Sequence, residues 1–460
     1  MLKKYIGDKQ FYRHVLGVAI PIMIQNGITN FVSLLDNIMI GQVGTEQMSG
    51  VAIANQLMFV FNICIFGSIA GAGIFSAQYF GCGDHKGVQN AFRLKIIICI
   101  IMTLLGVAIL GIWGTGLIGL FLHEGTGQES IEATLLYGKQ YLSILMISML
   151  PFAIEQAYSS TLRETGETVL PMKAGIVAVL VNLCLNYLLI FGKFGFPQLG
   201  VEGAAIATVI ARFVEMSIII SWTHIHKAKN QFIAGVYRNI KIPGYLVSRV
   251  ISKGAPLTLN EILWASGQAV LIQCYSVRGL STVAALNISS TLTNIFNIVF
   301  IATGSTISII IGQLLGAGKM KEAKDTSGKL IFFTESCCII LGIVLGLFSL
   351  FFPDMYNTSG EVKALASSFI IVSAIGLPIH AFMNSCYFML RSGGQVWVTF
   401  LFDSVFLWVA SIPLAFLLSN YTAVPIVIVF FLCQMVDIIK CVIGIVLIRK
   451  EVWLKNIIAK

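Results

Sequence analysis

A single acidic residue lies inside the first long apolar segment of the chain. Asp36 occurs late in the run FVSLLDNIMIG, and no Lys or Arg lies within one helical turn of it. An isolated carboxylate in apolar surroundings is costly, because it has lost its hydration without gaining a partner. Asp36 is therefore expected either to carry a proton or to hold a cation. The alternative is a purely structural, hydrogen-bonded acid.

Two amides and a second acid occupy other apolar segments. Asn182 and Asn186 lie one turn apart on one face of a helix, and amides are neutral oxygen donors suited to a small hard cation beside a carboxylate. Hydrogen bonding between helices is the alternative role for both amides. Glu261, in the run TLNEILW, is a second isolated acid, for which a transport role and a structural role both remain open.

Other charged residues in these segments have a partner in the same helix. Arg212 with Glu215, and Asp437 with Lys440, are spaced i,i+3, so each pair is expected to neutralise itself and to be structural. His380 is interpreted as a packed residue at a helix interface, with a proton relay as the alternative. Three further acids lie nearer the ends of the segments or near polar neighbours and receive no assignment: Glu155, Glu335 and Asp403.

The composition is that of a membrane protein. Of the 460 residues, 57% are apolar and 11% are charged, with a net charge of +9. So few charges cannot cover a water-facing surface, which excludes a soluble enzyme, a disordered chain and a nucleic-acid binder. The sequence also lacks a phosphate-binding GxxxxGK[ST] loop and the HExxH and GxSxG motifs, so no cofactor is expected and an ion gradient must supply the energy.

Twelve apolar segments are long enough to cross a bilayer as helices, since about 20 residues span its hydrocarbon core. Continuous runs of this length exclude barrel strands, so the predicted fold is an all-α integral membrane protein. We expect no cleavable signal peptide before the first segment. The segments lie near 14–40, 51–79, 96–122, 134–160, 168–192, 201–223, 250–277, 281–312, 328–352, 364–389, 397–419 and 422–448.

The sequence repeats itself after 235 residues. Pro21 matches Pro256 at this offset, and the run Gln78–Gly83 matches Gln313–Gly318. Six spans per copy is an even number, so both copies enter the membrane in the same direction and form a parallel repeat. The prediction is two six-helix lobes with a binding site between them near mid-membrane. The expected divisions are an N-lobe at 1–223, a cytoplasmic linker at 224–249 and a C-lobe at 250–460.

Basic residues predict the orientation. With the N-terminus inside, the segments expected outside hold only Lys139, Lys193, Arg278 and Lys363, and one of these loops carries Glu124, Glu129 and Glu132. Cytoplasmic loops are enriched in Lys and Arg, so both termini are predicted to be cytoplasmic. The expected location is the inner (plasma) membrane.

The motifs together resemble the multidrug and toxic compound extrusion (MATE) family. The resemblance covers essentially the whole chain. It rests on Pro21, the run Asp36–Gly41, Leu162-Arg163 with Gly166, the run Asn182–Tyr187, and the run Gly200–Thr208.

The resemblance implies an antiporter that exports cationic, amphipathic compounds as Na⁺ or H⁺ enters. It implies an N-lobe cation site of Asp36, Asn182, Asn186 and Thr208, with Na⁺ at the first three, and a possible C-lobe role for Glu261. Small organic cations and membrane lipids are the expected partners, with no nucleic acid, and the chain is expected to be a monomer.

Three positions depart from the family pattern. Glu261 lies five residues after Pro256, where some members carry a Glu about eight residues after the Pro, although the same helix face is reachable. Residue 186 is Asn where some members carry Asp, which leaves the choice between Na⁺ and H⁺ open. Gln395 stands where some members place an acid after the Leu-Arg of the tenth span, which weakens the case for a C-lobe cation site. The alternative function is a lipid-linked oligosaccharide flippase of the same superfamily, which should have a cavity rich in Arg and Lys. The isolated acids favour cationic cargo.

Overall fold

The computed structural model describes residues 5–121, 128–238 and 241–459, without the side chains of 32–34, 37 and 128–130. The predicted outer acid Glu124 and the side chain of Glu129 therefore lie outside the described residues. Within those ranges the regular structure is entirely helical. The all-α prediction is confirmed.

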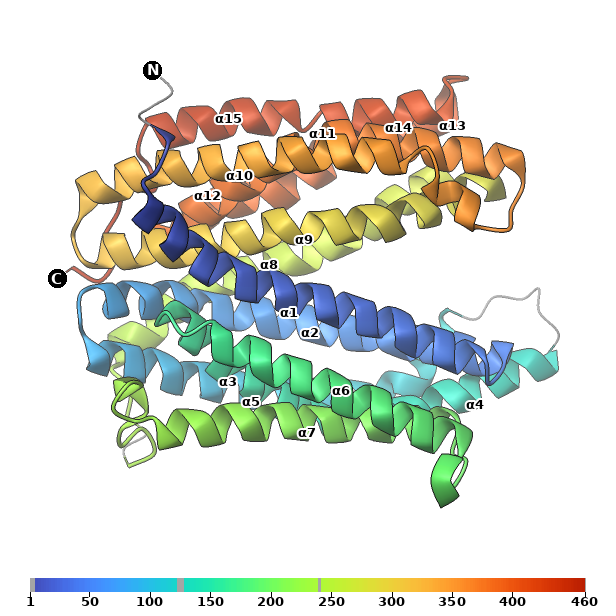
Figure 1. Cartoon of the computed structure of the whole chain (residues 1–460), viewed down its shortest axis with the longest axis horizontal. Helices are drawn as coiled ribbons and strands as arrows, with labels where there is room; N and C mark the ends of the chain where they lie inside the picture. The colour runs from blue at the N-terminus through green and yellow to red at the C-terminus, as the bar shows by residue number, and fades with distance from the viewer. Residues whose placement is uncertain (1–4, 122–127, 239–240, 460) are drawn as a thin grey trace. The chain divides into compact units, whose positions relative to one another are not determined.

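Each predicted span corresponds to one long helix or to one interrupted helix (Figure 1). Ten of these, within the described residues, are long and apolar enough to cross a membrane. Helices α1 and α8 complete the set with 33 residues each, about 50 Å at 1.5 Å per residue. The helices are α1 (Lys9–Gly41), α2 (Thr45–Gly81), α3 (His85–Gly119), α4 (Gln128–Leu145) with α5 (Met149–Glu164), α6 (Val169–Phe191), α7 (Val201–Ile225), α8 (Gly244–Ser276), α9 (Leu280–Gly316), α10 (Met320–Phe348), α11 (Gly360–Ser392), α12 (Val396–Phe400) with α13 (Ile412–Tyr421), and α14 (Ile426–Met435) with α15 (Ile438–Arg449).

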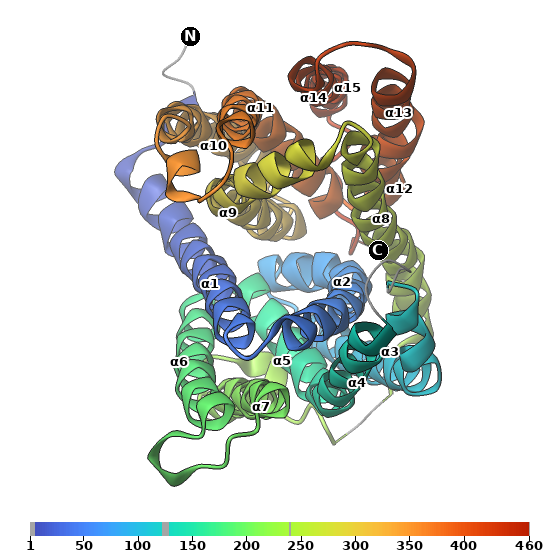
Figure 2. The ribbon, with the colours of Figure 1, turned by 90° about the vertical axis from the view of Figure 1, so that its right-hand side faces the viewer.

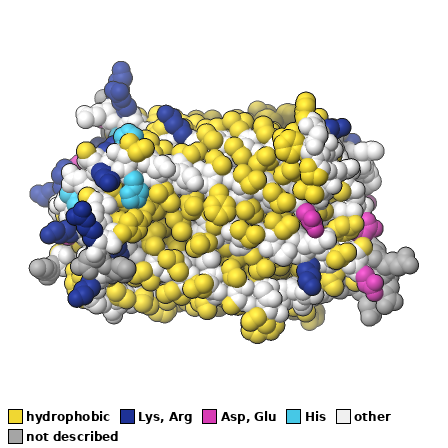
Figure 3. All heavy atoms as spheres, turned by 90° about the horizontal axis from the view of Figure 1, so that it is seen from below, with side chains coloured by type: hydrophobic (Ala, Val, Ile, Leu, Met, Phe, Trp, Pro, Cys, Tyr) yellow, Lys and Arg dark blue, Asp and Glu magenta, His cyan; other side chains and the backbone are white. Residues whose placement is uncertain are grey.

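The outer surface of the helices is apolar. Large side chains such as Leu104 and Ile112 on α3 are 65% and 70% exposed. Figure 3 shows a continuous hydrophobic band on one face, with Lys and Arg gathered mainly at one end and acidic side chains at the other. A soluble protein rarely exposes so large an apolar surface, so this band is the surface that faces lipid. The chain is a multi-pass membrane protein.

The helix boundaries repeat with the offset found in the sequence. Helices α1 and α8 have the same length and begin 235 residues apart, as do α2 and α9. The repeat also appears in a close helix contact. A β-carbon at Gly81 would lie 1.9 Å from the carbonyl oxygen of Gln313, and one at Gly316 would lie 1.9 Å from that of Gln78. Only glycine permits backbones to approach so closely.

The chain forms two compact units. One comprises residues 1–23, 77–83 and 259–460, and the other comprises 24–76 and 84–258. The predicted lobe boundaries at 223 and 250 follow the sequence repeat, whereas these units follow packing, and the two divisions differ at α1, at the end of α2 and within α8. The lobe boundaries therefore stay a prediction.

The second unit holds most of the predicted site residues. Helix α6 packs along α7, and α7 also packs against α4 and α5 (Figures 1 and 2). An apolar cluster that includes Ile65, Met149 and Ala205 joins α2, α5 and α7. The polar side chains of α6 and α7 are thereby held in a rigid packed interior.

Candidate functional site

Four residues predicted as a cation site form one chain of hydrogen bonds. The side-chain amide of Asn186 donates to the Asp36 carboxylate at 2.6 Å and to Asn182 Oδ1 at 3.2 Å. Asn182 donates to Thr208 Oγ1 at 3.3 Å. The Thr208 hydroxyl donates to the backbone carbonyl of Ala204, one turn earlier on α7, at 3.1 Å. The structure thus brings these predicted residues together from α1, α6 and α7.

One acceptor in this chain has no hydrogen-bond donor. Asn186 is 1% exposed, and its Oδ1 is buried without a hydrogen-bond partner. A buried polar atom without a partner costs about 1–3 kcal/mol, so native structures rarely leave one. A carboxylate with two amide oxygens and a hydroxyl is an all-oxygen set, which suits a hard cation such as Na⁺. The residues present therefore fit such an ion, and a protonated Asp36 is the other means of neutralising the carboxylate.

A basic residue near Asp36 was not expected from sequence. Arg212, on α7, interacts electrostatically with the Asp36 carboxylate. The predicted pair between Arg212 and Glu215 is present, with 2.9 Å between Nη1 and Oε2. The interpretation of Asp36 as an acid without a cationic neighbour was therefore wrong, because helix packing brings α7 to α1. Arg212 is shared among three carboxylates, those of Asp36, Glu215 and Glu155, so it does not fully neutralise any one of them.

Two further residues complete the surroundings of Asp36. The Tyr141 side chain, on α4, hydrogen-bonds with Asn55 and Thr208 and interacts electrostatically with Asp36. Tyr141 is 4% exposed. The sequence does not show whether a tyrosine in an apolar helix belongs to a functional site or only packs against its neighbours. Sequence reasoning therefore missed both Tyr141 and Asn55.

A buried polar network lies beside this site on α5. Glu155, left unassigned from sequence, is 1% exposed and accepts a hydrogen bond from Gln156 at 2.6 Å. Its carboxylate interacts electrostatically with Glu215, Arg163 and Arg212. Two carboxylates and two guanidinium groups balance one another here, which is the arrangement that tolerates charge in an apolar interior.

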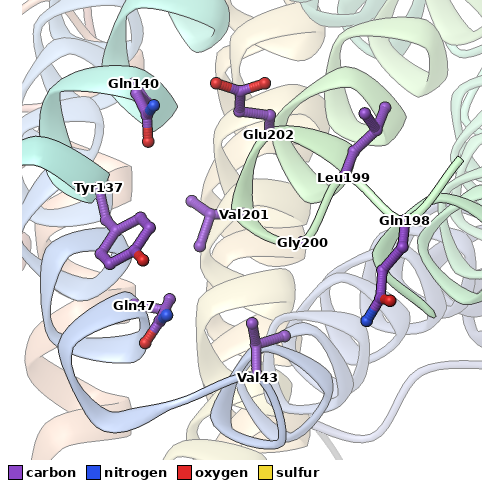
Figure 4. Close-up of a pocket in the computed structure, with 9 residues that line it drawn as sticks. All are labelled: Val43, Gln47, Tyr137, Gln140, Gln198, Leu199, Gly200, Val201 and Glu202. Carbon is purple, nitrogen blue, oxygen red and sulfur yellow. The ribbon is translucent and has the colours of Figure 1, made fainter. Parts of the chain in front are cut away.

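The same unit contains a polar cavity at one end of its helices (Figure 4). Its volume is about 360 Å³. Gln47 contributes a buried Oε1 that has no hydrogen-bond partner. The lining comes from the turn between α1 and α2, from α4, and from the segment that leads into α7: Val43, Gln47, Tyr137, Gln140, Gln198, Leu199, Gly200, Val201 and Glu202. The cavity could hold a small polar or cationic molecule.

Glu261, the remaining predicted residue, belongs to the other compact unit. The Tyr387 hydroxyl donates to Glu261 Oε1 at 3.5 Å, and the carboxylate interacts electrostatically with Arg391 and Asp403. Glu261 is therefore not the isolated acid that the sequence suggested. Arg391 lies on α11, whereas Glu261 lies on α8, so the sequence around Glu261 does not reveal this basic neighbour.

Long lipid-facing helices around buried polar centres are the construction of a multi-pass membrane transporter. A family model, MatE, matches residues 21–188 and 256–417, which is more than half of the chain. The two matched segments begin at Pro21 and Pro256, the prolines that mark the sequence repeat. The chain belongs to the MatE family of membrane transporters and is not an enzyme.

Two relatives cover nearly the whole chain. The probable multidrug resistance protein NorM of Thermotoga maritima is 24% identical over 435 residues, which cover 92% of this chain and 89% of the relative. The probable multidrug resistance protein YoeA of Bacillus subtilis is 25% identical over 413 residues, which cover 88% of this chain and 87% of the relative.

Solved structures share the fold. A multidrug resistance MATE family transporter of the MOP superfamily, in an outward-facing conformation, superposes with a TM-score of 0.86 at 16% identity and 98% coverage of both chains. The Vibrio cholerae MATE transporter VcmN, in its bent form, gives a TM-score of 0.80 at 19% identity, over 96% of this chain and 97% of that one. The predicted twelve-span, two-lobed fold is confirmed by these neighbours.

Proposed function

We propose that this transporter exports cationic, amphipathic organic compounds in exchange for Na⁺ or H⁺, by alternating access. The observation that carries the proposal is the hydrogen-bonded chain that joins Asp36, Asn186, Asn182 and Thr208 and leaves Asn186 Oδ1 without a donor. The two relatives named as multidrug resistance proteins support the choice of cargo.

The coupling ion acts through the charge of Asp36. With Na⁺ or H⁺ bound, Asp36 contributes no net charge to the apolar interior. The ion-bound transporter can therefore change between its inward-facing and outward-facing conformations at low energetic cost. With the ion released, the carboxylate is attracted to a cationic cargo instead. One charge that crosses 100 mV supplies about 2.3 kcal/mol, enough to concentrate a neutral solute about fiftyfold. When one monovalent cation is exchanged for one Na⁺ or H⁺, no net charge crosses, and the concentration gradient of the coupling ion supplies the energy.

The charge distribution favours cationic cargo over the pyrophosphate of a lipid-linked oligosaccharide. Within the part of the N-terminal half that the structure describes, the buried Lys95 and the partly buried Arg163 and Arg212 all interact with acidic side chains. A flippase would instead need cations directed at its phosphate cargo. The flippase is therefore the second candidate, to be separated by experiment.

We propose a plasma-membrane location with both termini in the cytoplasm, as the distribution of Lys and Arg predicts. The chain is proposed to work as a monomer, with lipid as its surroundings and no resident cofactor.

Proteoliposomes with the purified protein test the coupling. Dye efflux is measured under an imposed Na⁺ gradient, an imposed H⁺ gradient, or neither. Export driven by one gradient identifies the ion. Transport of a phosphate-containing lipid analogue, without dye export, would support the flippase instead. Asp36→Asn is expected to abolish gradient-driven export while the protein still elutes as a folded species.

Glu132→Gln is the matched control for that variant. Glu132 is an exposed acid on α4 in the same compact unit, so its loss changes the charge by the same amount without touching the site. Full gradient-driven export by the Asp36→Asn protein would contradict the coupling role.

A further inference from the structure

A second group of charged side chains lies in the compact unit that contains residues 259–460. The Lys440 ammonium lies 3.4 Å from Asp437 Oδ1 and 3.9 Å from Asp403 Oδ1. His380 Nε2 lies 3.6 Å from the other oxygen of Asp437. Asn260 donates to Asp403 Oδ2 at 3.1 Å. These four ionisable groups come from α11, from the π-helical segment η6 (Leu401–Val405), and from the α14–α15 region.

The three places that supply these side chains contain a proline within a helix, a π-helical segment and a helix interruption. Helix α11 contains Pro378, two residues before His380. Asp403 lies in η6, which is followed by a second π-helical segment, η7 (Leu407–Ser411). Asp437 lies at the interruption between α14 and α15. Interrupted helices at membrane depth are tolerated where they are buried in protein or line a cavity, and π-helical turns frequently mark functional sites.

The charges of the group do not balance when His380 is neutral. Asp403 and Asp437 bring two negative charges, and Lys440, whose side chain is 6% exposed, brings one positive charge. One negative charge is therefore in excess. A surplus charge at membrane depth is costly, and a proton on His380 would remove it at a position next to Asp437.

The side chains around the group bring no positive charge that would offset this excess. Glu335, on α10, interacts electrostatically with Cys441, and Cys433 on α14 and Tyr275 on α8 interact with Asp437. The thiol and phenol groups are neutral near pH 7, so they add no charge to the group. Helix α9 contributes no ionisable side chain at all.

Glu261 and Arg391 do not supply the missing positive charge. Asn260 and the Tyr387 hydroxyl, 3.4 Å apart, connect Asp403 to Glu261. Arg391 interacts electrostatically with Glu261, so these two opposite charges offset each other. The excess negative charge therefore stays with Asp403 and Asp437.

We propose that Asp403, Asp437, Lys440 and His380 form a second proton-binding site, in which His380 takes up the proton. This site is separate from Asp36 and shares no side chain with it. The proposal therefore does not depend on the ion that Asp36 binds. His380, which sequence reasoning interpreted as a packing residue, becomes the group that changes charge.

The test measures the protonated fraction of each histidine in the purified full-length protein. Exchange of the imidazole C2 hydrogen with deuterium, followed by mass spectrometry, gives this fraction for His380 and for the exposed His14. At about pH 6, near the ordinary titration range of histidine, Asp437→Asn is expected to lower the protonated fraction of His380 by about threefold or more. Lys440→Met is expected to raise it, because the surplus of negative charge grows.

Opposite effects of these two substitutions are what a charge-balanced site requires, and a packing role would not produce them. Asp325→Asn is the matched control, since it removes an acid of the same unit whose partner is Lys329, outside the group. Both Asp325→Asn and Asp36→Asn should leave His380 unchanged. If Lys440→Met does not fold, Asp403→Asn replaces it and should lower the fraction as Asp437→Asn does. A His380 that stays neutral at about pH 6, or that ignores Asp437→Asn, overturns the proposal.

Discussion

Asn186 on α6 donates a 2.6 Å hydrogen bond to Asp36 on α1, across a separation of 150 residues in the sequence. This bond fixes the position of the Asp36 carboxylate. The amide nitrogen of Asn186 also donates to Asn182 Oδ1, so both amide hydrogens are used. The Oδ1 atom of the same amide is thereby left as an acceptor. One residue therefore both holds the acid and offers a ligand atom beside it.

Asn186→Leu is expected to impair coupling about as severely as loss of the acid itself. The substitution removes the donor to Asp36 and the free acceptor together, while it keeps the branched shape of the side chain. A lost hydrogen bond to a charged group costs about 1.5–3 kcal/mol, so gradient-driven efflux should fall about tenfold or more. The measurement is the initial rate of dye efflux from proteoliposomes. Efflux at the rate of the unmodified protein would show that Asn186 has only a packing role.

Arg212→Met is expected to destabilise the protein, because Glu215 is 4% exposed and would lose its partner. Removing one member of a fully buried ion pair costs about 3–5 kcal/mol. The loss should be smaller here, because the Arg212 side chain is 33% exposed and Arg163 also interacts with Glu215. The double variant Arg212→Met/Glu215→Gln should recover most of this loss, since it leaves no unpaired charge at Glu215. Thermal unfolding in detergent gives both values. A double variant as unstable as the single one would assign the loss to the packing of Arg212 on Phe152, whose ring centre lies 5.2 Å away.

Gly81→Ala and Gly316→Ala are both expected to destabilise the protein. Each added methyl group would meet a backbone carbonyl 1.9 Å away, and a backbone atom cannot move aside as a flexible side chain can. Overpacking of this kind costs about 1–3 kcal/mol. Gly111→Ala on α3 is the control, since a β-carbon there has no neighbour within 4 Å and alanine favours a helix. Equal melting temperatures for all three variants would contradict the close contact.

The proposed orientation is tested with the native cysteine Cys82. Cys82 is exposed and lies in the turn between α2 and α3, which is predicted to face the cytoplasm. In a variant that keeps this cysteine alone, a membrane-impermeant maleimide should label inside-out vesicles and spare intact cells. A second variant that carries only Asn357→Cys, on the opposite predicted side, should give the reverse pattern. Labelling of Cys82 in intact cells would reverse the topology.

The lengths of the apolar segments predicted the spans well, because the hydropathy of a segment depends only on its own residues. The register of the repeat was equally readable, since Pro21 and Pro256 mark the same place in each copy. The grouping of Asp36 with Asn182, Asn186 and Thr208 came from the resemblance to a family. No local pattern places a residue of α1 beside residues of α6 and α7, because that depends on helix packing.

Helix packing also explains why the prediction of isolated acids was wrong. Asp36 and Glu261 both looked isolated because the sequence window around each one contains no basic residue. Arg212 and Arg391 reach them from other helices. The π-helical segment that carries Asp403 has no sequence signal either, since its other residues are of the types found in a regular membrane helix. Charge pairing between helices could not be predicted from one-dimensional spacing.

The reciprocal contact of Gly81 with Gln313 and of Gly316 with Gln78 resembles an interface between identical subunits. In a two-fold dimer, residue i of one copy meets residue j of the other, and j meets i in return. Here the two copies are joined in one chain, and the equivalent positions still meet in this way. Such a contact is expected if a half-length protein once formed a homodimer and two copies of its gene were later fused. It implies that the two halves, expressed as separate chains, retain a surface by which they can recognise each other.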